Sequence, residues 1–177
     1  MRCFIAIDIP EDVKKEIIKL QGIIKGDVKL VEPENLHFTL KFLGEIDDAT
    51  IAAVKSILAE TASSVPAFDV NLKGLGVFPS KKFIRVVWIG AEGKSMLDMH
   101  TTVEESLEHM FRLDKPVPHL TIARVKSQKG LKNIAGFVES NEDREIGRMR
   151  VDRIKLKKST LVREGPVYED IGEFELC

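Results

Sequence analysis

Two short segments of the chain carry the same alternation of polar and apolar residues. They are Leu36-His37-Phe38-Thr39-Leu40 and Pro118-His119-Leu120-Thr121-Ile122. Successive side chains of a strand point to opposite faces, so each histidine shares a face with the threonine two residues on. The pattern therefore predicts two strands that bury an apolar face and present a His-Thr pair. Brought together, the two pairs would form an acid–base site.

The composition is that of an ordinary folded domain. The chain has 177 residues, 44% hydrophobic and 31% charged, which fits one domain with a substantial core. A net charge of −1 argues against steering onto long nucleic acids by the whole molecule. No apolar run approaches the roughly 20 residues that span a bilayer, so no membrane partner is expected. With only Cys3 and Cys177, we expect reduced thiols and a cytoplasmic protein.

The remaining pattern predicts strands and helices that interleave twice. Strands are expected over residues 2–8, 36–43, 68–75, 83–89, 119–125, 149–162 and 167–176, and residues 76–82 read as a loop. Helices are expected after Pro10, after Asp47, over 94–111 and around 134–138. The two motif histidines lie 82 residues apart, which suggests an internal duplication. We predict an α+β fold of two antiparallel-sheet lobes with outer helices and a central cleft. It forms one domain, 1–177, with lobes of about 1–90 and 91–177 and strands free to exchange between them.

The bare His-x-Thr spacing is a weak signal, because His100 and Thr102 share it inside a helical pattern. We interpret His100 and His109 as surface or packing residues. Two histidines lack the further ligands of a zinc site, and no Gly-x-Ser-x-Gly turn supports a serine nucleophile. No metal and no cofactor are expected. Paired histidines and hydroxyls suit phosphoryl chemistry, with one histidine as base, the other as acid and threonines on the phosphoryl oxygens.

Longer matching segments then support a family resemblance. They include Arg2-Cys3-Phe4-Ile5-Ala6, Asn35 to Gly44, Gly74 to Pro79, Arg85 to Gly90, Pro118 to Val125, Leu156 to Leu161 and Gly165 to Tyr168. The chain resembles the two-histidine phosphoesterase superfamily, and within it the RNA 2′,3′-cyclic phosphodiesterases first described as 2′-5′ RNA ligases.

The resemblance implies an enzyme that hydrolyses the 2′,3′-cyclic phosphate at an RNA 3′ end to a 2′-phosphate. It implies that His119 activates water, that His37 protonates the departing 3′ oxygen, and that Thr39 and Thr121 hold the phosphoryl oxygens. The residues alone do not assign the acid or the base. The expected partners are RNA 3′ ends, such as tRNA fragments, or nucleotides, bound by a monomer.

Three further residues are candidates for substrate binding. Lys41 falls on the face of His37 by alternation, which predicts a phosphate contact, with a solvated lysine as the alternative. Arg124 follows the second motif but falls on the opposite face, so either a bulge turns it or it serves the fold. Phe4 could stack a base or pack in the core. Eight Lys and Arg residues between 144 and 163 form either a cationic face for RNA or a solvated one.

Two other functions remain open from the sequence. The same site could act as a 2′-5′ RNA ligase that joins RNA ends such as tRNA halves, with a sugar hydroxyl in place of water. Alternatively, the chain could be a non-catalytic module that binds RNA or nucleotides.

Overall fold

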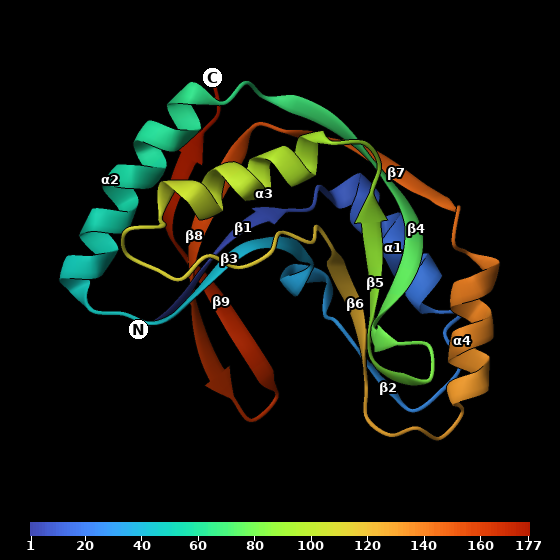
Figure 1. Cartoon of the computed structure of the whole chain (residues 1–177). Coiled ribbons are helices and arrows are strands. Elements are labelled where there is room, and N and C mark those ends of the chain that lie inside the picture. The colour runs from blue at the N-terminus through green and yellow to red at the C-terminus, as the bar shows by residue number, and fades with distance from the viewer.

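The structure is a computed structural model that describes residues 1–177. Nine strands form one antiparallel sheet in the order β7-β4-β5-β6-β3-β1-β8-β9, with β2 paired to β6 (Figure 1). The strands are β1 (Arg2–Asp8), β2 (Val28–Leu30), β3 (His37–Glu45), β4 (Phe68–Ser80), β5 (Phe83–Ala91), β6 (Leu120–Val125), β7 (Glu145–Val151), β8 (Arg153–Val162) and β9 (Gly165–Glu175). The helices are α1 (Glu11–Gln21), α2 (Asp48–Ser64), α3 (Ser95–Ser106) and α4 (Leu131–Ser140), with a 3-10 turn, η1, at Pro33–Asn35. The predicted α+β class is confirmed.

The sheet is narrowest where the two motif strands meet. β3 and β6 pair at a single position, Phe38 with Leu120. On one side of this joint lie β7, β4, β5 and β6, and on the other lie β3, β1, β8 and β9. Each group takes two strands from the first 91 residues and two from the rest. We propose that these groups are the two lobes, so that each lobe contains strands from both halves of the chain.

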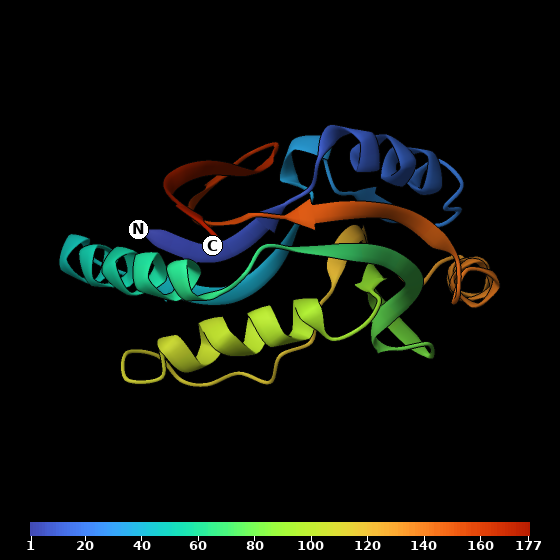
Figure 2. The ribbon, with the colours of Figure 1, turned by 90° about the horizontal axis from the view of Figure 1, so that it is seen from above.

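The helices pack around this curved sheet (Figure 2). α1 packs on β6 and β7, α4 on β4 and β5, α2 on β8 and β9, and α3 on β3 and β4. α1 buries Val13, Ile17 and Leu20 at helical spacing, and the Asp47 carboxylate caps α2 by accepting a hydrogen bond from the Thr50 amide at 2.8 Å. No helix of the structure is both long and apolar enough to span a membrane.

One contiguous core of 35 buried hydrophobic residues runs beneath both groups of strands. It includes Phe38 and Leu120, both no more than 1% exposed, so side chains hold the joint where backbone pairing is nearly absent. The relative placement of the two motif strands therefore depends mainly on packing.

Two predicted boundaries are wrong. Residues 76–80 are not a loop but the end of β4, which pairs with β5 as far as Ser80 and Phe83. The predicted single strand over 149–162 breaks at Asp152 into β7 and β8. β7 pairs with β4 and β8 pairs with β1, so the chain crosses from one group of strands to the other at this residue. Tertiary pairing, which a single sequence does not reveal, sets both boundaries.

The basic run between residues 144 and 163 does not form one cationic face. Its side chains are distributed over β7 and β8 and meet carboxylates on neighbouring strands. Arg148 and Arg150 pair with Asp69, while Lys155 and Lys157 each pair with Asp8 and Asp170. Most of this positive charge is therefore balanced within the fold.

Candidate active site

The joint between β3 and β6 brings the two motifs face to face. The strands are antiparallel, and Phe38 pairs with Leu120. Continuing that register places His37 opposite Thr121 and Thr39 opposite His119. Each histidine therefore lies across from the threonine of the other motif. Phe38 and Leu120 point into the core, so the four polar side chains are on the opposite face.

A bulge in β3 changes the alternation just after the first motif. Ile5 of β1 pairs with Lys41 and Ala6 pairs with Thr39, so Leu40 is an extra residue. Leu40 and Lys41 consequently both face the interior, at 1% and 3% exposed. The face assigned to Lys41 from the sequence is wrong, because the bulge turns its side chain away from His37 and toward Glu104 on α3.

The second motif contains the same irregularity. Val87 of β5 pairs with Ala123 and Trp88 pairs with Thr121, so Ile122 is the extra residue. Ile122 and Ala123 are both buried, and Arg124 returns to the face of His119 and Thr121. Of the two alternatives for Arg124, the structure shows the bulge.

The two motifs are thus equivalent over six residues. The spacing His-x-Thr-x-x places Phe42 after the first bulge and Arg124 after the second, each five residues beyond its histidine. Phe42 is 66% exposed and faces the cleft, whereas strict alternation with Phe38 and Leu40 would place it in the core. The consecutive apolar residues Ile122 and Ala123 coincide with the second bulge.

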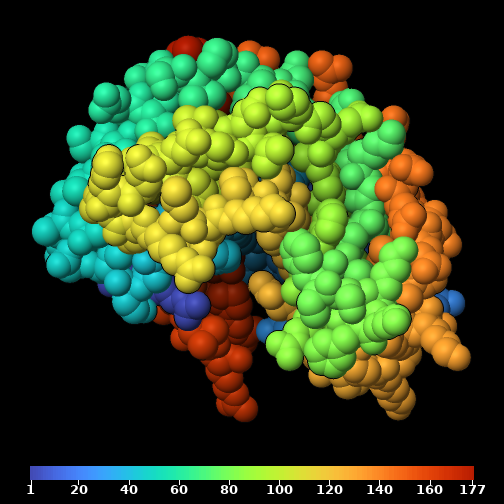
Figure 3. All heavy atoms as spheres, in the orientation of Figure 1, coloured from blue at the N-terminus to red at the C-terminus, as the bar shows by residue number.

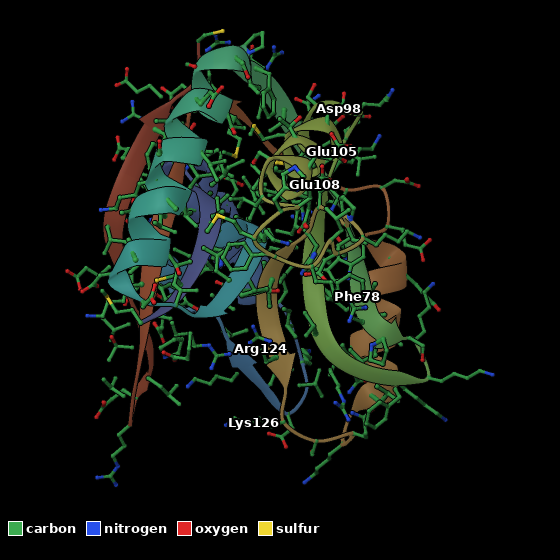
Figure 4. All side chains as sticks on the ribbon, turned by 60° about the vertical axis from the view of Figure 1, so that its left-hand side comes forward. Phe78, Asp98, Glu105, Glu108, Arg124 and Lys126 are labelled. Atoms are coloured by element: carbon green, nitrogen blue, oxygen red, sulfur yellow. The ribbon has the colours of Figure 1, made fainter.

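The four motif side chains line a cleft of about 580 Å³. Its opening is the hollow in Figure 3 between the β8–β9 hairpin and the turn that joins β4 to β5. In Figure 4, Arg124 lies toward the end of β6 and Phe78 lies on β4. The lining also includes Lys29, Glu32, Glu34, Asn35, Phe42, Phe78, Val86, Glu164 and Tyr168. The side-chain amide of Asn35 donates to the carbonyl oxygen of Pro166 at 3.1 Å and connects the β8–β9 hairpin to the wall of the cleft.

A backbone carbonyl fixes the tautomer of each motif histidine. Nδ1 of His37 lies 2.6 Å from the carbonyl oxygen of Asn35, and Nδ1 of His119 lies 2.7 Å from that of Val117. A carbonyl only accepts, so each Nδ1 carries the proton and each neutral ring has its lone pair at Nε2. Nε2 of His37 lies 2.9 Å from Oγ1 of Thr39. Both rings are set up to exchange a proton at Nε2.

The surroundings of His37 favour its neutral form. Burial holds the pKa of His37 at about 4 because the charged imidazolium loses its hydration there, and nearby Lys157 lowers it further. The hydrogen bond to Asn35 and the charge of Asp8 oppose this shift without cancelling it. In the free protein at neutral pH, His37 is therefore neutral.

The lowered pKa of His37 should make stability depend on pH. Its pKa is lower in the folded than in the unfolded chain, so between pH 6.5 and about 4 the unfolded chain binds the extra proton. The contribution of His37 to the free energy of unfolding is fully present above pH 6.5. It is lost as the pH falls from 6.5 to about 4, by up to about 3 kcal/mol. Urea unfolding of wild type and His37→Asn across this range should show a steeper loss for wild type. The same dependence of the free energy of unfolding on pH in both proteins would contradict the lowered pKa of His37.

Phe4 lies beneath the site rather than in it. The Phe4 side chain is 3% exposed, and its ring centroid is 5.1 Å from that of His37 and 4.8 Å from that of Tyr168. It packs the ring of His37 from below and has no free face for a base. Of the two alternatives for Phe4, the structure shows packing. The aromatic rings that line the cleft are those of Phe42, Phe78 and Tyr168, for which the sequence pattern predicts no role.

Phe4 and Phe42 form a matched pair for testing this difference. We expect Phe4→Ala to lower the free energy of unfolding by about 3–5 kcal/mol, because it removes a buried ring. Phe42→Ala should change it by about 0.5 kcal/mol or less, because its ring is exposed. Urea unfolding of both variants decides this, and equal losses would refute the burial difference.

The two remaining histidines lie outside the cleft. His100 is buried on α3 and His109 is exposed beyond the end of that helix.

Two His-Thr strands that face one cleft in a duplicated antiparallel sheet define the class of two-histidine phosphoesterases.

Comparison with known proteins narrows the class. The model of the LigT-like phosphoesterase family matches residues 7–88 and 91–168, once for each half. An RNA 2′,3′-cyclic phosphodiesterase of Methanocaldococcus jannaschii is 41% identical over 98% of this chain and 100% of that protein. One from Methanothermobacter thermautotrophicus is 35% identical over 99% of both chains. The chain therefore belongs to the LigT-like phosphoesterase family.

Solved structures agree on the fold. A Thermus thermophilus protein superimposes with a TM-score of 0.84 at 27% identity, over 99% of this chain and 98% of that one. The apo form of Escherichia coli LigT has a TM-score of 0.79 at 24% identity, over 99% and 96% of the two chains. The family model that matches twice and the repeated bulge both bear out the predicted duplication.

Proposed function

We propose that this phosphoesterase hydrolyses the 2′,3′-cyclic phosphate at RNA 3′ ends to a terminal 2′-phosphate, without a metal ion. The observation that carries the proposal is the cleft itself, where both His-Thr pairs meet with each histidine tautomer fixed. Full-length relatives bear the name RNA 2′,3′-cyclic phosphodiesterase, which supports the choice of substrate.

Hydrolysis of the cyclic phosphate requires two proton transfers, one at each histidine. His119 accepts a proton at Nε2 from a water molecule whose oxygen attacks phosphorus. The bond from phosphorus to the 3′ oxygen breaks, and Nε2 of His37 gives that oxygen a proton. The hydroxyls of Thr39 and Thr121 donate to the non-bridging oxygens, where charge increases in the transition state. Exchange with solvent then restores both rings.

His37 needs a proton that it lacks in the free protein. The phosphodiester is an anion, and bound beside Nε2 it favours the charged imidazolium. We therefore infer that the substrate raises the pKa of His37 from about 4 and supplies the acid when it is required. The Nδ1 hydrogen bond of His119 is solvent-exposed, whereas that of His37 is partly buried. Nε2 of His119 makes no hydrogen bond within the protein, unlike Nε2 of His37, which suits a base that activates water.

The rest of the cleft suits one nucleotide beside the phosphate. Arg124 provides a cation on the face of His119, and the rings of Phe42, Phe78 and Tyr168 offer surfaces on which a base could stack. Hydrogen bonds from arginine to phosphate are charge-assisted and position it without reading the sequence. We accordingly propose RNA 3′ ends, tRNA fragments among them, as substrates of a cytoplasmic monomer.

The test uses an oligonucleotide with a 2′,3′-cyclic phosphate, in buffer containing EDTA. A cyclic end resists phosphatase, so phosphate released by phosphatase after treatment with the protein reports opening of the ring. We expect opening that needs no added metal. An intact cyclic end would overturn the proposal. A 5′-hydroxyl oligonucleotide in the same mixture measures any 2′-5′ ligation, and ligated product in excess of hydrolysed product would assign the ligase activity instead.

A further inference from the structure

The segment before the second motif has little backbone support. It connects α3 to β6, and residues 112–119 form no backbone–backbone hydrogen bonds. Pro116 and Pro118 each fix φ and restrict the residue before them, so the segment from 115 to 118 is stiff. A stiff segment without backbone pairing is placed by its points of attachment.

A buried ion pair provides the attachment at the start of this segment. Nζ of Lys41 donates to Oε2 of Glu104 at 2.5 Å and to the carbonyl oxygen of Arg112 at 2.9 Å. The same Glu104 oxygen accepts from the Asp114 amide at 3.1 Å. The side chains of Lys41 and Glu104 are only 1% and 3% exposed. The pair therefore holds the backbone of residues 112 and 114 against the core.

The anchored segment also carries the carbonyl that orients His119. The carbonyl of Val117, between the two prolines, accepts the Nδ1 proton of His119 at 2.7 Å. That bond keeps the lone pair at Nε2, where a base needs it. Because the stiff segment transmits its anchored position, the ion pair determines where this carbonyl lies.

The first motif needs no such attachment. The carbonyl that orients His37 belongs to Asn35, the last residue of the 3-10 turn. The backbone N–H of Asn35 donates to the carbonyl oxygen of Glu32 at 2.9 Å and so holds this residue in place. At the position equivalent to Lys41, the second motif has Ala123. The ion pair is thus present once, between Lys41 of β3 and Glu104 of α3, where it contacts the start of the unsupported segment.

We propose that Lys41 and Glu104 are positioning residues for His119: their buried ion pair anchors residues 112–114 and so fixes the tautomer of the base. The inference rests on the proposed function for its effect on rate. Stability alone is a weak reason for such a pair, because well-packed hydrophobic residues commonly replace a buried ion pair without loss.

The double variant Lys41→Met/Glu104→Leu tests this by replacing both charges with apolar side chains of similar size. We expect urea unfolding close to wild type, kcat lower by about 10- to 100-fold, and KM within about threefold, since small misplacement of a catalytic group is enough for such a loss. Nitrogen-15 NMR of the imidazole should show His119 with mixed tautomers. The matched control is Lys81→Met/Glu142→Gln, which removes an exposed ion pair of 2.6 Å elsewhere and should keep both kcat and the tautomer.

Two outcomes separate positioning from structure. A stable double variant with wild-type kcat and His119 protonated only at Nδ1 would overturn the inference. If the variant does not fold, Pro116→Ala/Pro118→Ala softens the same segment outside the core and should also mix the tautomers, and an unchanged tautomer there would overturn it. The NMR measurement needs no substrate, so it stands even if the proposed reaction fails.

Discussion

His37→Ala and His119→Ala should each lower kcat for opening of a cyclic phosphate by about 10² to 10⁴, which is the usual value of one proton-transfer role. The two rings face one cleft, and no other histidine lines it, so no nearby imidazole replaces the lost one. Single-turnover assays on wild type and both variants measure the effect, and far-ultraviolet circular dichroism confirms the fold. Full activity of either variant would refute the paired mechanism.

A change of leaving group assigns acid and base. A phosphodiester with a nitrophenolate leaving group departs without a proton, so it bypasses the acid but not the base. With that substrate, His37→Ala should recover most of its loss while His119→Ala should not. Recovery by His119→Ala alone would exchange the two roles and leave the site itself intact.

Thr39→Val and Thr121→Val should each lower kcat by about 10² to 10³, because each removes a hydrogen-bond donor aimed at developing charge. Valine matches threonine in shape, and both positions are only partly buried, so stability should change little. Thr39→Ser and Thr121→Ser are the matched controls, because they keep the hydroxyl and should retain most activity. Steady-state kinetics separates kcat from KM, and valine variants with wild-type kcat would remove the threonines from the mechanism.

The sequence was sufficient for the parts of the site that depend on local alternation. His37, Thr39, His119 and Thr121 all lie in the cleft, because the few strand residues that follow each histidine are enough to define a face. The internal duplication was visible from the spacing of the motifs. These are properties of short segments, and short segments are what a single sequence describes well.

The residues just beyond each motif could not be placed in the same way. One extra residue in β3 turns Lys41 inward and Phe42 outward, and one in β6 turns Arg124 into the cleft. A bulge depends on the pairing of neighbouring strands, so alternation counted along one strand gives the wrong face after it. The break at Asp152 and the extension of β4 have the same origin, because both are set by which strands pair.

The most direct test of the central claim is phosphorus NMR of an RNA oligonucleotide with a cyclic end, incubated with the protein in EDTA. We expect the cyclic signal to be replaced by that of a terminal 2′-phosphate monoester, at a rate that His119→Ala reduces to near background. A cyclic signal that persists with wild-type protein, or one that disappears equally fast with His119→Ala, would contradict it.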